Sequence, residues 1–159
     1  MANQQAAGTE PDEVREAGFS AEERAAMKQR AAELKTAGRG RNADKAAADL
    51  EAVLSKIAEM PGPDRALAER IHAGVTSAAP ELAPRLWYGQ PAYARAGKVV
   101  CFFRSGEADK GRCCVFGFTE EAQLDEPDGV WPVSYAVTPG LTETGEAAIR
   151  ARVERAVGA

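Results

Sequence analysis

Aromatic residues are concentrated in one stretch of this chain, and that concentration places the core. Nine of the ten lie between Trp87 and Tyr135, whereas the first sixty residues contain Phe19 alone and are rich in Ala, Glu, Lys and Arg. Large side chains dominate the energetics of a core, so we expect the core to centre on the second half. The 159 residues suffice for one compact domain and an appendage.

Charge and cysteine usage exclude several classes of protein. The formal net charge is -4, with charges of both signs mixed along the chain, so we expect no nucleic-acid partner. The chain begins without a secretory signal, and no window approaches the about 18 apolar residues that span a bilayer. We therefore expect a cytoplasmic location and no membrane partner. Three cysteines form an odd set, which favours reduced thiols over a disulfide framework.

The first half predicts helices. Residues 1–18 lack periodicity and are expected to be a disordered leader, followed by a helical extension over 19–62 and a folded domain over 63–159. Ser20 and Glu23 have capping-box spacing, which predicts a helix from Ser20 to Ala37 that ends at Gly38-Arg39-Gly40.

Two further helices are predicted before the strands begin. The helix from Ala43 to Glu59 carries an apolar face, which should dock on a partner surface, and Pro61 ends it. A third helix is predicted from Asp64 to Ala78. The apolar face of the second helix consists of Ala46, Leu50, Val53, Leu54 and Ile57.

Beyond Pro84 the pattern changes from helix to strand. Residues 95–98, Arg-Ala-Gly-Lys, indicate a tight hairpin, and a Gly-Gln-Pro kink separates the first two strands. Thr142 can cap a last helix that runs to Val157. The predicted strands are Leu86–Tyr88, Ala92–Arg95, Lys98–Phe103, Arg112–Phe118 and Trp131–Val137.

The order of these elements predicts the fold class. Helices come first, then strands joined by short loops, then a helix, which favours an α+β fold over a doubly wound parallel sheet. We expect a two-layer sandwich in which the third and last helices cover one face of an antiparallel sheet.

From about Asp64 to Val157 the chain resembles the YdhG-like family, a domain of unknown function with a frataxin-like two-layer architecture. The resemblance implies the same sandwich, and it makes iron a candidate ligand, since some members are described as iron chaperones. It rests on Ala79-Pro80-Glu81, on Trp87-x-Gly89-x-Pro91-x-Tyr93, on Gly97-Lys98-Val99-Val100, on Phe102-Phe103 and on Trp131-Pro132.

An iron site of frataxin type would use surface carboxylates, because hard cations prefer oxygen ligands. The helix that matches the first helix of the family has only Asp64 and Glu69 as acidic residues, which departs from an acidic ridge. The loop over 120–128 holds more negative charge. Its spacing is not that of a calcium loop, and a solvated acidic loop is favoured over a cation site.

The candidate ligand site is the segment that contains Trp87, Tyr88, Pro91 and Tyr93. Two aromatic residues flanking a Gly-Pro kink can form one wall of an apolar pocket, with tyrosine hydroxyls as polar anchors. The alternative is a structural corner filled by large rings, and this alternative is favoured.

Thiol and imidazole sites have weaker support. Cys113 and Cys114 are adjacent on a predicted strand, so their side chains should point to opposite faces, and Cys101 could lie across a hairpin from one of them. Small buried thiols are favoured over a zinc site. His72 lies at the edge of an apolar helix face, without a partner visible in the sequence.

The sequence thus favours a non-enzymatic module that binds a small ligand, a metal ion or a protein through the sheet and the Trp87–Tyr93 rim. An alternative is an assembly protein that uses the apolar face of the second helix, which makes a homodimer a candidate state. A third hypothesis is a redox protein that uses Cys101 or Cys113. Basic neighbours of such a thiol are Lys98, Arg104 and Arg112.

Overall fold

The structure, a computed structural model, describes residues 20–108 and 110–158, with only the backbone described at residue 22 and residues 29–41. The predicted leader over 1–18 lies outside this range. Met1–Asp44 and Lys45–Ala159 form two separate units, and the sheet belongs to the second. Residues 45–62, which the sequence assigns to the extension, are thus part of the folded unit.

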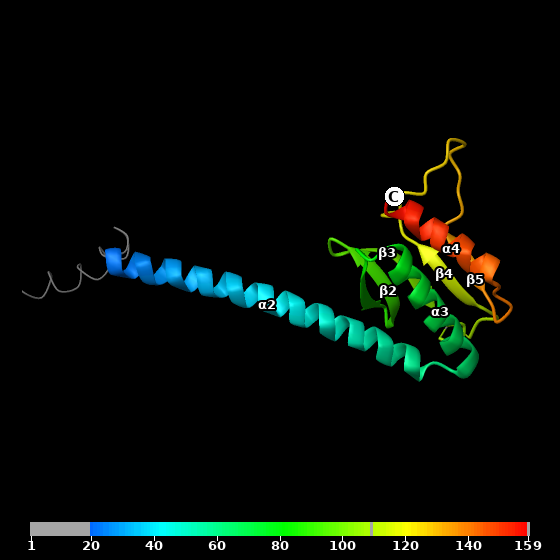
Figure 1. Cartoon of the computed structure of the whole chain (residues 1–159), viewed down its shortest axis with the longest axis horizontal. Coiled ribbons are helices and arrows are strands. Elements are labelled where there is room, and N and C mark those ends of the chain that lie inside the picture. Colours follow the sequence, from blue (N-terminus) through cyan, green and yellow to red (C-terminus); the bar gives the residue numbers. More distant parts are fainter. Residues whose placement is uncertain (1–19, 109, 159) are drawn as a thin grey trace, which may run out of the picture. The chain divides into compact units, whose positions relative to one another are not determined.

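The first described helix, α2, is continuous over Ala21–Glu59 (Figure 1). Its start is capped as predicted, since the Ser20 hydroxyl accepts a hydrogen bond from the Glu23 amide at 3.2 Å. The predicted break at residues 38–40 is wrong: glycine costs only about 1 kcal/mol against alanine in a helix, and no proline enforces an end before Pro61. Val53 and Ile57 are buried, which confirms that the last turns of α2 dock.

Five strands form one antiparallel sheet in the order β1-β2-β3-β4-β5, so each strand pairs with its neighbour in sequence. Helices α3 (Gly62–Ala78) and α4 (Glu143–Ala156) lie on the same side of this sheet (Figure 1), which confirms the α+β sandwich. No helix of the described chain has the length and apolar character to cross a membrane. The strands are β1 Ala83–Trp87, β2 Gln90–Arg95, β3 Lys98–Arg104, β4 Cys114–Phe118 and β5 Ser134–Val137.

Two tight turns join the first three strands. Ala96 and Gly97 both have positive φ, which confirms the predicted hairpin between β2 and β3. The predicted Gly-Gln-Pro kink is wrong, because Gln90 and Pro91 lie within β2 and pair with β1. The chain instead reverses at Tyr88 and Gly89, with φ of 50° and 74°.

A bulge in β3 sets which side chains face the helices. Tyr93 pairs with Cys101 and Ala94 pairs with Val99, so Val100 is an extra residue in β3. Val100 and Cys101 therefore both join the main core, with the helices. The opposite face of the sheet has its own small apolar cluster. Its members among the described residues all belong to strands: Ala92, Ala94 and Val99, with Trp87 and Phe102 packed against them.

Candidate functional site

The four residues that the sequence nominates as a ligand site lie in different surroundings. Tyr93 and Pro91 are buried, Trp87 is half-buried, and Tyr88 is 87% exposed in the turn. Tyr93 belongs to the main core and Trp87 to the cluster on the opposite face of the sheet. The sheet itself therefore separates the two residues, which cannot form one pocket wall.

Tyr93 contacts a histidine inside the main core. Its hydroxyl lies 2.9 Å from Nδ1 of His72, and its ring has no solvent exposure. Burial raises the pKa of Tyr93 and lowers the pKa of His72, so both groups favour their neutral forms. This pairing gives His72 the partner that the sequence did not reveal, and Tyr93 lies within β2 as part of the main core.

The face of the sheet opposite α3 and α4 carries an aromatic patch, formed by Trp87, Tyr88 and Phe102. The ring centroids of Trp87 and Phe102 are 5.4 Å apart, and those of Trp87 and Tyr88 are 5.0 Å apart. Phe102 lies over Gly117, where a Cβ atom would come within 2.4 Å of its ring. The glycine in β4 thus makes room for the outer end of the Phe102 ring.

Two arginines share this face with the aromatic patch. Arg85 precedes Trp87 by two residues in β1 and pairs with Ala92, which pairs in turn with Phe102. Arg104 follows Phe102 by two residues in β3. Because directly paired residues and residues two apart in a strand share a face, Arg85 and Arg104 lie on the same face of the sheet as Trp87 and Phe102.

Tyr88 adds an exposed ring at a position where tyrosine is unfavourable. The first position of a turn with two positive φ angles favours asparagine, aspartate or glycine, since a bulky side chain is strained there. Tyr88 nevertheless has a φ of 50° and remains almost fully exposed. The turn therefore holds a strained residue whose aromatic ring lies beside that of Trp87, with centroids 5.0 Å apart.

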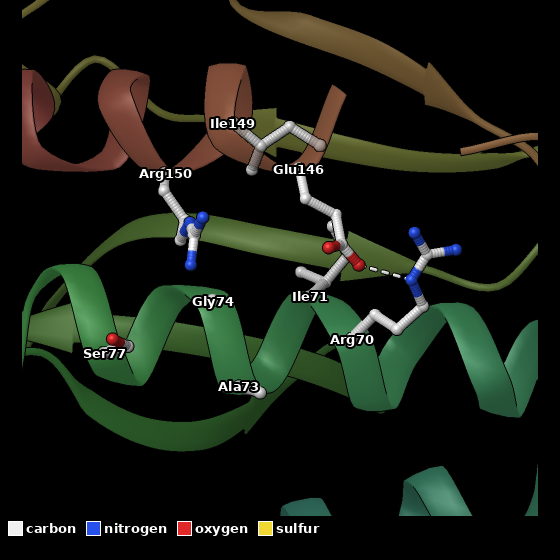
Figure 2. Close-up of a pocket in the computed structure, with 8 residues that line it drawn as sticks. All are labelled: Arg70, Ile71, Ala73, Gly74, Ser77, Glu146, Ile149 and Arg150. Atoms are coloured by element: carbon white, nitrogen blue, oxygen red, sulfur yellow. Dashed lines mark hydrogen bonds and ion pairs between the residues drawn. The ribbon is translucent and has the colours of Figure 1, made fainter. Parts of the chain in front are cut away.

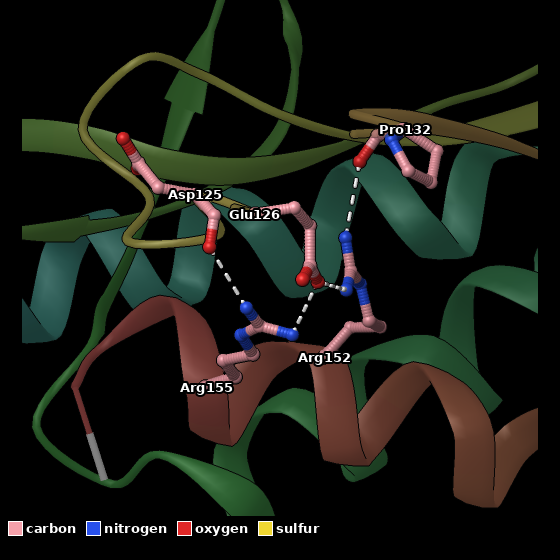
Figure 3. Close-up of polar contacts among 5 residues, drawn as sticks. All are labelled: Asp125, Glu126, Pro132, Arg152 and Arg155. Carbon is pink, nitrogen blue, oxygen red and sulfur yellow. Dashed lines mark hydrogen bonds and ion pairs between the residues drawn. The ribbon is translucent and has the colours of Figure 1, made fainter. Parts of the chain in front are cut away.

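The acidic loop between β4 and β5 is attached to α4 (Figure 3). Glu126 pairs with Arg155 at 2.5 Å and with Arg152 at 3.9 Å. Arg155 also donates to the carbonyl of Asp125, and Arg152 donates to that of Pro132. Arg152 and Arg155 therefore neutralise part of the negative charge of this loop, and their contacts hold the loop against α4.

Two of the three thiols lie in surroundings that disfavour the reactive thiolate. Cys101 and Cys114 are buried, and burial raises the pKa of both, to about 11 for Cys114. Cys113 is half-buried and precedes β4. The prediction that Cys101 lies across a hairpin from Cys113 or Cys114 is wrong, because Cys101 pairs with Phe118.

Asp64 fastens the start of α3 to the end of β3. Its carboxylate accepts hydrogen bonds from the Ser105 hydroxyl at 2.5 Å and from the Glu107 amide at 3.2 Å. The Ser105 bond is the main cause that lowers the pKa of Asp64, against an opposing effect of burial. Stability from this carboxylate is therefore present above its ordinary pKa of 3.8 and is lost as the pH falls through the lower, folded-state pKa.

We expect Asp64→Asn to lower the free energy of unfolding by about 1–2 kcal/mol at neutral pH, because a charged acceptor of two hydrogen bonds is lost. Urea denaturation at pH 7 and at acidic pH measures this difference, which should shrink in acid as the wild-type carboxylate is protonated. Glu69→Gln, on the exposed side of the same helix, is the control. Equal stability of Asp64→Asn and wild type at pH 7 would contradict this role.

Within the described part of the chain, no group of three or more His, Cys, Asp or Glu residues is placed to hold a metal ion. Comparisons with protein-family models, with curated proteins and with solved structures gave no significant match to this chain. The resemblance to the YdhG-like family therefore stays an expectation from the sequence.

Proposed function

We propose that this protein is a non-enzymatic recognition module that binds an acidic, partly apolar protein segment on the sheet face that carries the aromatic patch. The observation that supports it best is the contact of Trp87 with Phe102 on the side of the sheet that also carries Arg85 and Arg104. Aromatic and arginine side chains are the groups most enriched where proteins bind one another.

The charge of this face favours an acidic partner. The whole chain carries a net charge of -4, yet the half-buried Arg85 beside the aromatic patch is basic, and among the described residues its guanidinium donates only to the carbonyl of Gly97, at 3.4 Å. Carboxylates bind the guanidinium fork in a bidentate geometry, while apolar side chains of the partner can cover the rings. An extended segment suits the surface because it can contact several strands at once.

Selection of a random peptide library on the intact protein tests the proposal. We expect the enriched peptides to combine aspartate or glutamate with aromatic or aliphatic residues, and their binding to weaken as salt is added. Peptides without acidic residues, or binding that is indifferent to Trp87, would remove the proposed surface.

The small-ligand and iron versions of the binding hypothesis remain proposals with less support. The arginines that share a face with the aromatic patch repel a cation rather than attract one. Iron is thus supported by the resemblance alone. Calorimetric titration with ferrous and ferric iron tests that version, and saturable binding at micromolar concentrations would favour it over a protein partner.

A second candidate function, assembly through α2, has its own observation. Leu50 and Leu54 are 37% and 47% exposed on one side of the helix, whereas Val53 and Ile57 pack into their own domain. We expect Leu50→Glu with Leu54→Glu to halve the mass measured by light scattering if this side seals a homodimer, while the fold is kept. An unchanged mass in that double variant, with Ala48→Glu on another exposed side of the helix as control, would exclude the assembly role.

A further inference from the structure

A hollow between α3 and α4 lies apart from the aromatic patch, on the helical side of the sheet. Its volume is about 390 Å³, within the range of sites for small molecules. Figure 2 shows its two ends: an ion pair of Arg70 with Glu146 at one, and Arg150 reaching from α4 towards α3 at the other. The remaining lining residues are Ile71, Ala73, Gly74, Ser77 and Ile149.

The two arginines of the hollow differ in their partners. Arg70 donates to the Glu146 carboxylate and, at 2.8 Å, to the carbonyl of Leu141, so its charge is already matched. Among the residues that the structure describes, neither the Arg150 guanidinium nor the Ser77 hydroxyl has a hydrogen-bond partner. With Glu146 neutralised by Arg70, the lining of the hollow carries one unmatched positive charge.

Gly74 shapes the end of the hollow at which Arg150 lies. A Cβ atom at this position would come within 3.3 Å of Cγ of Arg150. The bare glycine thus lets the stem of Arg150 lie close over α3, with its head beside the hollow and on the side of Ser77 (Figure 2). The half-buried Ile149 and an edge of the buried Ile71 supply apolar surface between the two charged ends.

From this geometry we propose that the hollow binds a small organic carboxylate. The carboxylate pairs with the guanidinium of Arg150 and accepts from the hydroxyl of Ser77, while its apolar body covers Ile71 and Ile149. A single unmatched charge fits a monoanion. The apolar lining favours an organic acid over inorganic phosphate, whose oxygens would be left facing isoleucine. This site is independent of the peptide surface on the other face of the sheet.

Amide NMR titration of the full chain with benzoate tests the proposal. We expect saturable shifts at residues of α3 and α4 that line the hollow, with at least about tenfold weaker binding in Arg150→Gln, because a charge-assisted pair is lost. Gly74→Ala should also bind benzoate more weakly while keeping or raising the melting temperature, since alanine favours the helix and narrows the hollow.

Three controls make the outcome decisive. Arg65→Gln removes the same charge from an exposed position near the start of α3 and should bind benzoate like wild type. Benzamide, of the same shape without the charge, and inorganic phosphate, with charge but no apolar body, should both bind far more weakly than benzoate. Equal binding of either probe, unchanged binding in Arg150→Gln, or shifts that map elsewhere would overturn the site.

Discussion

Replacing Tyr93 with alanine is expected to lower the free energy of unfolding by about 3–5 kcal/mol, the cost of removing a large aromatic ring from a close-packed core. Tyr93 has no solvent exposure and packs in the main core beneath the helices. Urea denaturation followed by circular dichroism measures the loss. An effect of this size identifies Tyr93 as a core residue, whereas a residue that lined a ligand pocket would lose binding with little change in stability.

Tyr93→Phe isolates the hydroxyl from the ring. It keeps the packing and removes only the hydrogen bond to His72, so we expect a loss of about 1 kcal/mol. A loss below about 1 kcal/mol in Tyr93→Ala itself would contradict the core assignment, because large-to-small changes in a filled core cost several times more.

Replacing Trp87 with alanine is expected to weaken binding of a library-selected acidic peptide by about 30-fold or more, as truncation of a central aromatic contact does at protein interfaces. Trp87 lies between the rings of Tyr88 and Phe102, so its loss removes the middle of the aromatic patch. Fluorescence polarisation of a labelled peptide measures the affinity, and thermal melts confirm that the variant is folded.

Trp131→Ala is the matched control for that variant. Trp131 is also a half-buried tryptophan, but it packs against the main core rather than against the cluster that holds Trp87. We expect the peptide to bind Trp131→Ala and wild type alike. If both tryptophan variants lost affinity equally, the effect would reflect general destabilisation and the assignment of the peptide surface would fail.

Local chemistry made much of the fold predictable. The Ala-Gly turn between β2 and β3, the Thr142 cap of α4 and the runs of strand-forming residues each depend on near neighbours in sequence. The structure confirms the turn, the cap and a strand in each of the five predicted segments. The helix end predicted at Gly38-Arg39-Gly40 was wrong, because a local glycine signal alone does not stop a helix. Glycine weakens a helix without forbidding it, so flanking helix formers can continue through it.

The candidate site was less predictable because it depends on register. Tyr93 and Trp87 are close in sequence, but strand alternation and the turn at Tyr88 put them on opposite faces. The bulge at Val100 then shifts the alternation in β3, which leaves Phe102 beside Trp87 while Cys101 and Phe103 face the core. No local pattern encodes that shift. The hollow could not be predicted either, because Gly74 and Arg150 come together only through the packing of α3 against α4.

Mapping a selected acidic peptide onto the full chain by amide NMR tests the proposed peptide surface most directly. We predict that the largest shifts fall on the sheet residues around Trp87, Phe102 and Gly117, while the amides of α3 and α4 that line the benzoate hollow stay unchanged. Shifts confined to the helices, or spread evenly over both faces of the sheet, would contradict the assignment of the aromatic patch as the recognition surface.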